Sequence, residues 1–563
     1  MLQVFFTGRL MMAAHFETGT MASPQHYSSR ILNQLGLVAA MVDELGIVEW
    51  VDRLLPKNQE KQIVSYGQAV KAMILNGLGF NQRTLYLTPH FFQDKPVGRL
   101  LGEGIEAQHL NDDLLGRTLD AIFQYGPTAL YSQLAVQSVF RLGLLCRFGH
   151  LDATSFHVDG RYNSDAAPDE ESSIIHMTRG YSRDHRPDLN QVVVQLISER
   201  QAGIPLLMES LSGNNSDKDS FRETVKAHVS QLNREVGLEY LIADSALYTS
   251  ETLGEMKGFY WITRVPETLN LAQFLIQATA PELMKNRAQS NFISLGTGYA
   301  GTRQRWVIVY SPEAYQRAIK TVSKASLQQT SAESKAFEHL CRQTFSCETD
   351  ARNALSELEK KLKYTNVFEP RIIRQPRYCG PGRPAKSKVP DYQTYRIEGG
   401  LASRLELHQQ RLQRKSCFIL ATNQQDLEAL SNEELIKAYK DQQKVERGFR
   451  FLKDPLFMAS TLFLKSPERI MALMMVMTLC LLVYAALEHR IRQSLIQAQQ
   501  TFPNQVGRMV SNPTARWVFQ FFSGIHVLII EHMQTLILGI NQYHWLLLKL
   551  LGEPYEKIYS GDG

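Results

Sequence analysis

Hydrophobic residues between positions 27 and 147 recur with helical spacing and are interrupted by turn residues. In SYGQAVKAMILNGLG, Ser65 is a suitable N-cap, and in LNDDLLGRTLDAIFQYG, Asn111 can cap a helix that ends before Gly126. Short helices joined by tight turns are typical of helix-turn-helix modules. The pattern predicts a helix-turn-helix-like DNA-binding domain over 27–147, or equally a helical cap on the domain that follows.

After residue 147 the pattern changes from helical spacing to strands. The segments FGHLDATSFHVDG, NQVVVQLIS and GIPLLMESLSG are rich in β-branched or alternating apolar residues. Residues 217–236 then have a helical pattern, and LEYLIAD and GFYWITRV are two further apolar strands. The order of three strands, a helix and two strands predicts an α/β core whose first part covers 148–265.

Between residues 266 and 415 the chain departs from this order, which indicates an insertion that is partly β-rich and partly helical. It contains the strand-like RWVIVYS and a long, charged helical stretch over 312–364. A continuous helix beyond that stretch is excluded by Pro370, Pro376, Pro381, Pro384 and Pro390.

Compact α/β character returns after the insertion. KSCFILATN predicts a strand, and SNEELIKAYKDQQKVERGFRFLKD predicts one helix, with Ser431 as N-cap and Glu434 at capping-box spacing. We assign 416–500 to the second part of the core and 501–563 to a C-terminal helical region.

The run Ile470–Leu487 has 18 residues without a charge, which is the threshold length for a membrane span. It contains Thr478 and Cys480 and is followed at once by the polar sequence EHR. A helix that is apolar on all sides is buried either in a large protein or in lipid. We expect a buried core helix and no membrane partner, with a membrane protein as the alternative.

The composition fits a folded chain of several domains. Its 563 residues are 44% hydrophobic and 21% charged, which is enough for two to four domains and excludes disorder as the main state. The six cysteines are scattered without a C-x-x-C pair, which favours a reducing cytosol over a disulfide framework or zinc site. Residues 1–26 lack a basic n-region and a cleavage motif, so we expect an uncertain N-terminal extension and no signal peptide.

The net charge of +5 is small, but its distribution is uneven. The window 366–390 contains six Lys and Arg residues and a single acidic residue, Glu369. Within this window, Arg383 lies between Gly382 and Pro384, and an extended Arg of this kind can enter a narrow minor groove of DNA. A solvated linker is the alternative. The cations that we expect to engage phosphates here include Arg383, Lys386 and Lys388.

Two carboxylates stand at strands of the predicted core. Asp152 lies within HLDATSFHV, with His150 and Thr154 on its own face, and Asp244 ends the apolar strand LIAD. Carboxylates in such positions are costly unless they are solvated, paired or metal-bound. If the two strands are parallel neighbours, both acids lie at one edge of the sheet. The alternative for either residue is an ordinary turn aspartate.

The helix predicted over 433–453 carries polar side chains at the spacing of one helical face. They are Tyr439, Gln442, Glu446 and Lys453, which offer a phenol, an amide, a carboxylate and an ammonium group. A solvated polar face is the alternative.

This spacing, Tyr439-x2-Gln442-x3-Glu446-x6-Lys453, resembles the Y-x2-R-x3-E-x6-K signature of the insertion sequence four superfamily of bacterial DDE transposases. The blocks LDATSFHVDG, GYSRDHRPDLNQ, GNNSD and IADSALYTSE are similar to the superfamily's blocks around its first and second catalytic acids. GQAVKAMILNGLGF and HLNDDLLGR resemble a subgroup with a long insertion. Gln442 departs from the signature, which has Arg at this position.

The resemblance implies a ribonuclease-H-like core in which Asp152, Asp244 and Glu446 are catalytic and bind two Mg²⁺ or Mn²⁺ ions. It implies a transposase that binds the terminal inverted repeats of its own element, cleaves double-stranded DNA and transfers the strand to target DNA by cut-and-paste transposition. It also implies a homodimer on DNA and a bacterial cytoplasmic, nucleoid-associated location. The alternative is a domesticated or inactive DNA-binding protein.

Further DNA contacts follow from the same resemblance. Tyr439 and Lys453 are expected at phosphates near the cleaved end. Gln442 can donate a hydrogen bond but brings no charge, so the role of the usual Arg is expected to pass to Arg447 or Arg450.

Aromatic and polar residues elsewhere leave alternatives open. Trp306 resembles an insertion-domain Trp that stacks on a flipped base, with a core Trp as the alternative. Trp261 is expected in the core. The polar group His185, Arg186 and Asp188 could contact DNA or orient a metal ligand, or could form a structural turn.

Overall fold

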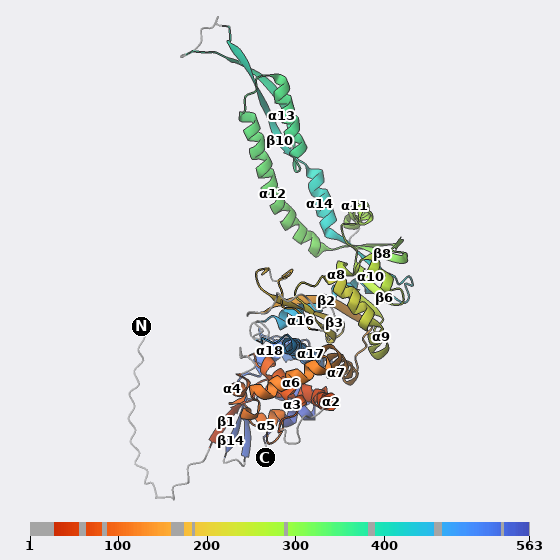
Figure 1. Ribbon diagram of the computed structural model, residues 1–563, viewed down its shortest axis with the longest axis vertical. Helices are drawn as coiled ribbons and strands as arrows, with labels where there is room; N and C mark the ends of the chain where they lie inside the picture. Colours follow the sequence, from red (N-terminus) through yellow and green to blue (C-terminus); the bar gives the residue numbers. More distant parts are fainter. Residues whose placement is uncertain are drawn as a thin grey trace, which may run out of the picture.

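The computed structural model describes residues 27–55, 63–80, 87–158, 174–182, 186–285, 291–380, 389–454, 464–530 and 534–561. The molecule is elongated, with a helical region at one end, a central sheet, and an arm that projects from the opposite end (Figure 1). The extension 1–26 and the residues His185, Arg383, Lys386 and Lys388 lie outside the described residues.

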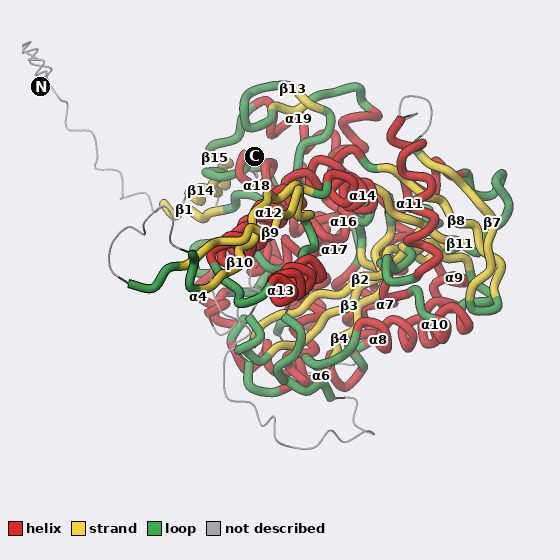
Figure 2. The backbone as a smooth tube through the Cα atoms, turned by 90° about the horizontal axis from the view of Figure 1, so that it is seen from above, coloured by secondary structure: helices red, strands yellow, loops and turns green. Residues whose placement is uncertain are grey.

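The centre of the molecule is a mixed sheet of eight strands in the order β4-β3-β2-β5-β6-β11-β8-β7. Strands β2, β5 and β6 are parallel to one another, and every other neighbouring pair is antiparallel. The view in Figure 2 shows β7, β8 and β11 side by side toward one end of this sheet. The strands are β2 (Phe148–His157), β3 (Gln191–Glu199), β4 (Pro205–Ser212), β5 (Tyr240–Ala243), β6 (Tyr260–Arg264), β7 (Phe292–Tyr299), β8 (Thr302–Tyr310) and β11 (Cys417–Thr422).

The predicted order of three strands, a helical segment and two strands is confirmed by β2 to β6. The helical segment contains α8 (Asp217–Thr224), the π-helical turn η3 (Val225–Val229) and α9 (Ser230–Val236). Between β5 and β6 lie η4 (Ser245–Leu247) and α10 (Ser250–Glu255). Both faces of the sheet are buried. The neighbouring residues Leu241 and Ile242 belong to different hydrophobic clusters, one on each face, and each is 0% exposed.

The structure corrects the start of the insertion. The strand RWVIVYS is part of β8, which pairs with β11 from Tyr310–Cys417 to Arg305–Thr422 and so belongs to the central sheet. The cause is burial, because Trp306 to Tyr310 are all buried and an isolated hairpin could not cover them. Helix α11 (Asn270–Lys285) packs against β8 and β11.

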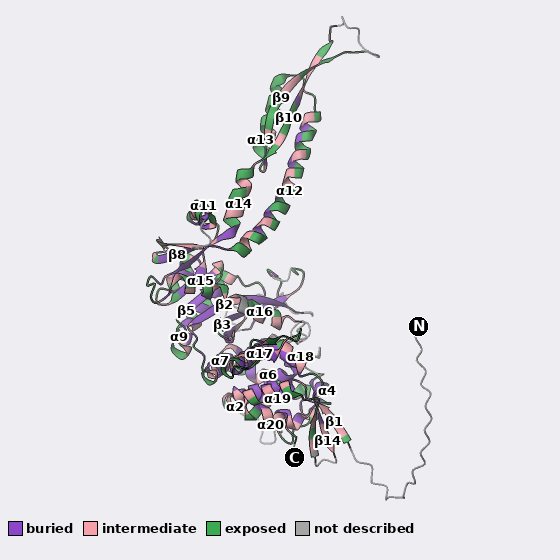
Figure 3. Cartoon of the chain, turned by 180° about the vertical axis from the view of Figure 1, so that it is seen from behind, coloured by how far each residue is buried: buried purple, intermediate pink, exposed green. Residues whose placement is uncertain are grey.

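The arm comprises residues 312–416. Its elements are α12 (Pro312–Arg342), α13 (Glu348–Lys361), the antiparallel strands β9 (Thr365–Arg377) and β10 (Tyr392–Ser403), and α14 (Leu405–Ser416). Two of the prolines that exclude a helix lie within β9, which is compatible with its place as an edge strand of a two-stranded sheet. Most of the arm is exposed or intermediate in burial (Figure 3), and its own core contains Phe337, Leu340, Ala351, Leu355 and Ile397.

The helical region at the other end is built from both ends of the chain. Its N-terminal elements are β1 (Tyr27–Ile31), α1 (Leu35–Glu44), α2 (Ile47–Leu54), α3 (Tyr66–Leu78), α4 (Thr88–Phe92), α5 (Val97–Leu101), η2 (Ala107–His109), α6 (Asp112–Tyr125) and α7 (Pro127–Leu142). Ser65 and Asn111 cap α3 and α6 as expected, each accepting a hydrogen bond from a backbone amide.

The C-terminal region, predicted to be helical, contains strands as well. After helix α17 (Pro467–Gln497), the elements of this region, 501–563, are β12 (Phe502–Pro503), β13 (Met509–Val510), α18 (Ala515–Phe521), β14 (His526–Ile530), β15 (Gln534–Leu538), α19 (Gln542–Leu551) and α20 (Glu553–Ile558). Strand β14 lies between β1 and β15, so HVLII becomes a strand because it pairs with the N-terminal segment YSSRI.

Among the described helices, α17 is the one long and apolar enough to cross a membrane. Its most apolar 18-residue window is 89% buried within the protein, where α17 packs against α1, α3, α6, α7 and α19. These contacts agree with the expectation of a core helix.

Candidate active site

Asp152 and Asp244 lie level with each other on parallel strands. In the β2–β5 register His150 is opposite Ile242, and each aspartate follows two residues later along its own chain. Because side chains alternate with a period of two, both acids are on the face that Ile242 shares with α15. Asp152 is half-buried and Asp244 is exposed, so water can reach the carboxylates. Both acids therefore lie at one edge of the sheet.

Backbone amides orient the two aspartates. The amide of Ala153 donates to Asp152 Oδ1 at 2.8 Å, and the amide of Ala246 donates to Asp244 Oδ1 at 2.9 Å. Asp244 thereby caps the short helix η4. These hydrogen bonds hold one oxygen of each carboxylate in place.

The single helix predicted over 433–453 is two helices, α15 (Asn432–Lys440) and α16 (Gln443–Leu452). Asp441 and Gln442 form the turn between them, where the amide of Gln442 donates to the carbonyl of Tyr439 at 3.1 Å. Asp441 also accepts a hydrogen bond from Arg200 Nε at 2.6 Å, which anchors the turn to the end of β3. The turn changes the direction of the chain, so offset alone does not decide which side chains share a surface.

One open cavity of about 1020 Å³ brings the three acids together. It lies at the junction of the sheet edge, the α15–α16 turn and the base of the arm. The residues that line it include Asp152, Asp244, Glu446, Tyr439, Gln442 and Arg264. Lys453 is not among the lining residues; its ammonium lies 5.9 Å from the ring centroid of Phe156 on β2.

All three carboxylates affect the pKa of Tyr439. Burial raises the pKa of its phenol to about 12, although the positive charge of Arg264 acts in the opposite direction. The negative charges of Asp244, Asp152 and Glu446 raise the pKa further. The phenol is therefore protonated at neutral pH and is a hydrogen-bond donor in the cavity.

The donor set fits a hard divalent cation. Carboxylate oxygens are the ligands that Mg²⁺ and Mn²⁺ prefer, and Asp152, Asp244 and Glu446 bring to the cavity carboxylates that water can reach. Within the described parts of the chain, no three ligating side chains already converge on a single point. The three acids could hold a metal ion through side-chain rotation, for which the exposed Asp244 and Glu446 have room.

Arg264 is a site residue that the sequence pattern did not reveal. It ends β6, where Ala243 pairs with Thr263, so Arg264 is level with Asp244 on the adjacent strand. Its guanidinium contacts Glu267 at 2.5 Å and lies 5.6 Å from the ring centroid of Phe418. The available signal was the strand GFYWITRV, whose only charged residue stands at its carboxyl end.

Arg447 and Arg450, which were expected to take the role of the usual Arg, do not line the cavity of the acids. Both residues line another cavity, of about 370 Å³, between α16 and α17, together with Phe80, Tyr484 and Arg516. The uncharged Gln442 does line the cavity of the acids. Arg264 therefore provides a guanidinium there that the expected residues do not.

Trp306 is 1% exposed, which agrees with the core alternative and leaves its ring inaccessible to a base. Its indole N–H donates to Gln304 Oε1 at 3.0 Å, and the Tyr248 hydroxyl donates to the same oxygen at 2.7 Å. Trp261 is fully buried, as expected.

Arg186 and Asp188 form an exposed pair ahead of β3. Arg186 Nε and Nη2 donate to the two carboxylate oxygens of Asp188 at 2.9 and 2.8 Å. This hydrogen bonding from Arg186 lowers the pKa of Asp188 to about 2. The geometry agrees with the structural-turn alternative for these two residues.

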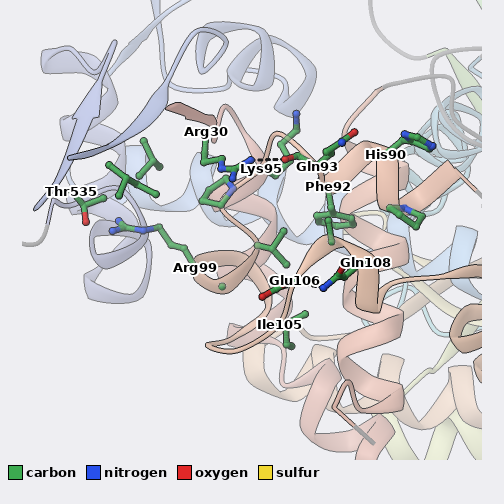
Figure 4. Close-up of a pocket in the computed structure, with 17 residues that line it drawn as sticks. Arg30, His90, Phe92, Gln93, Lys95, Arg99, Ile105, Glu106, Gln108 and Thr535 are labelled. Carbon is green, nitrogen blue, oxygen red and sulfur yellow. Dashed lines mark hydrogen bonds between the residues drawn. The ribbon is translucent and has the colours of Figure 1, made fainter. Parts of the chain in front are cut away.

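A different cavity, of about 740 Å³, lies in the helical region next to β14 (Figure 4). Two of its cations make hydrogen bonds within the protein. Arg30 donates to the carbonyl of Gln93, and Arg99 donates to the carbonyls of Ile558 and Ser560 near the C-terminus. Among its described lining residues Glu106 alone carries a carboxylate. The cavity of the three acids is therefore the better candidate for metal-dependent chemistry.

Comparisons with known proteins place the same region in a family. Residues 147–483 match the family described as transposase DDE domain, and residues 27–136 match a domain of unknown function (DUF4277). No curated protein matches the chain. Among solved structures, the chain is similar to the cryo-EM structure of piggyBac transposase synaptic complex with hairpin DNA, with 8% identity and a TM-score of 0.35 over 88% of this chain and 82% of that chain. Because the first match covers more than half of the chain, the protein belongs to the transposase DDE domain family and is a phosphoryl-transfer enzyme that acts on DNA.

Proposed function

We propose that the protein is a cut-and-paste transposase of the insertion sequence four superfamily, in its long-insertion subgroup. It binds the terminal inverted repeats of its own element, cleaves the DNA there and transfers the freed strand to target DNA. The observation that carries this proposal is that Asp152, Asp244 and Glu446 line one cavity although they lie far apart in the sequence. We assign end binding to the helical domain at 27–147 and propose a homodimer on DNA.

A ribonuclease-H-like core is part of the proposal. The strand order β4-β3-β2-β5-β6, with β3 antiparallel to β2 and with β5 and β6 parallel to β2, supports it. The positions of the acids support it as well. In chain order, Asp152 is on the first of these strands, β2, and Asp244 directly follows the fourth, β5.

Asp152, Asp244 and Glu446 would hold two divalent ions, Mg²⁺ or Mn²⁺, which when bound supply Lewis-acid activation of the attacking and leaving oxygens. The protonated Tyr439 donates a hydrogen bond to a phosphate oxygen. Arg264 supplies the positive charge that Gln442 lacks, and Gln442 can donate through its amide. Lys453 contributes a point charge to a phosphate farther along the strand.

The test uses the full-length protein and labelled duplexes that contain the inverted repeats flanking its reading frame, with Mg²⁺ or Mn²⁺. We expect cleavage at the repeat end and joining of the 3′ end to a target plasmid. Asp152→Ala, Asp244→Ala and Glu446→Ala are each expected to bind the duplex without cleaving it.

Glu313→Ala is the matched control, because Glu313 lines the same cavity but hydrogen-bonds to Ser311 at the start of α12. It is expected to cleave like the parent. Cleavage by any of the three acid variants at the parental rate would refute the assignment. Tight binding by the parent without cleavage in either metal would favour the domesticated DNA-binding protein.

A further inference from the structure

A second cavity adjoins the cavity of the acids at the base of the arm. A hollow of about 450 Å³ there shares Glu267, Thr321 and Lys415 with the lining of the acid cavity. Helices α12 and α14 pack against each other at this level, as Figure 1 shows for the lower part of the arm, and residues of both helices line the hollow. The two hollows therefore adjoin at these three residues, and we call the smaller one the arm-base groove.

Cations dominate the arm-base groove. Arg411, Arg414 and Lys415 project from the last turns of α14, and the latter two are exposed. The acidic side chain in the groove is Glu267, whose carboxylate lies 2.5 Å from the guanidinium of Arg264. Clustered cations next to a site of phosphoryl transfer favour a polyanion as the occupant.

The groove also holds an aromatic ring in a fixed position. The guanidinium of Arg411 lies 4.0 Å from the ring centroid of Tyr364, and the His408 ring lies 5.9 Å away in an edge-on arrangement. The backbone amide of Tyr364 donates to the buried Glu333 of α12 at 3.2 Å. A flat ring stacked with an arginine is the kind of surface on which unpaired bases stack.

We propose that the arm-base groove binds the DNA strand on one side of the scissile phosphate, with Arg414 and Lys415 at phosphates and Arg411 and Tyr364 beside a base. The inference rests on the proposed function, because it takes the cleaved DNA to be the polyanion that enters the acid cavity. Lys415 lines both hollows, so a strand leaving the acids meets it first.

The test measures binding of the full-length protein to the inverted-repeat duplex without divalent ions, at several salt concentrations. The slope of log association constant against log salt is the quantity compared. For Arg414→Gln/Lys415→Gln its magnitude should fall by roughly 1.4–1.8, because each of the two phosphate contacts contributes about 0.7–0.9 to the slope. The matched control is Lys360→Gln/Lys361→Gln, which removes two exposed cations at the end of α13. The control should keep the parental slope.

Two duplexes, each shortened on one side of the cleavage position, identify the strand. The difference between the groove variant and the parent should disappear with one shortened duplex and persist with the other. Equal slopes for the groove variant and the control would overturn the inference, and so would a difference that both shortened duplexes retain. Cleavage by the parent tests the proposed function separately. If the parent cleaves the duplex and the groove variant keeps the parental salt slope, the proposed role of the groove is refuted and the proposed function is not.

Discussion

The central sheet and the arm hold their functional side chains in different ways. In the sheet, Asp152, Asp244 and Arg264 lie level because hydrogen-bonded register places them there, above a core that spans both faces. In the described part of the arm, its hydrophobic cluster has five buried members, and most of the other residues are exposed or intermediate in burial. Groups that must meet reacting atoms need rigid positions, whereas cations that bind a backbone tolerate a softer support. In the proposals made above, the chemistry belongs to the sheet, and the arm base adds cations that contact DNA beside the acids.

The largest expected contrast comes from matched cavity mutations in the two regions. Leu241→Ala in β5 and Ile397→Ala in β10 each remove a side chain that is 0% exposed, at a cost of about 2–5 kcal/mol. Leu241→Ala should lower the melting temperature of the whole protein. Ile397→Ala should open the arm locally, so that limited proteolysis cuts within 312–416 while the main thermal transition stays in place. A shift of the main transition by Ile397→Ala would show that the arm and sheet unfold together.

Much of the sheet could be predicted from sequence because its information is local. Alternating apolar residues identified the strands from β2 to β6, and the acids at two of these strands predicted a common edge. Arg264 was missed because its importance depends on β6 lying beside β5, which no local pattern states. The break at Asp441 was missed because a tertiary contact, with Arg200, accompanies it.

Longer-range pairing explains the remaining differences. The segment around Trp306 looked like part of an insertion because its partner strand, β11, follows more than a hundred residues later. The strands β14 and β1 come from opposite ends of the chain, so HVLII had no visible partner. Helical spacing predicted that Lys453 shares a helix face with Glu446, but Glu446 lines the cavity of the acids and Lys453 does not.

The division between chemistry and grip is sharpened by Arg264→Gln. Cleavage by this variant should fall about 10–100-fold, or about 1.4–2.7 kcal/mol, with little change in duplex affinity. Adding Gln442→Arg should restore part of the rate, because that side chain lines the same cavity. Single-turnover cleavage and equilibrium binding measure the two quantities. Equal losses of cleavage and binding, or no restoration by Gln442→Arg, would contradict a role at the reacting phosphate.

Two aromatic residues extend the comparison. Trp306→Phe in the sheet loses the hydrogen bond to Gln304 and should cost about 1–2 kcal/mol of stability without changing DNA affinity. Tyr364→Ala in the arm should do the reverse, weakening binding to the inverted-repeat duplex while the main melting transition stays in place. Calorimetry and binding titrations measure both variants. A loss of DNA affinity in Trp306→Phe, with its fold intact, would reopen the base-stacking alternative.

The smallest expected effect concerns two buried glutamates with opposite pKa shifts. Glu199 in β3 accepts hydrogen bonds from the amides of Ala202 and Ile204, but its burial dominates and raises its pKa. Burial would also raise the pKa of Glu333 in the arm, yet hydrogen bonds from the Lys363 amide and other donors hold that pKa below its usual value.

The signs of the two pH responses are therefore opposite. The stabilising contribution of Glu199 is complete below about pH 4.5 and is lost as pH rises through its raised folded pKa. That of Glu333 is present above about pH 4.5 and is lost as pH falls through its lowered folded pKa. Hydrogen exchange, corrected for intrinsic rates, should show that acidification from pH 7 to about pH 3 weakens the arm relative to the sheet. Glu333→Gln should weaken the arm at pH 7 and reduce this pH dependence, whereas Glu199→Gln should leave the arm unchanged. An arm whose protection does not depend on pH in the parent would contradict the role of Glu333 in fixing Tyr364 beside the groove.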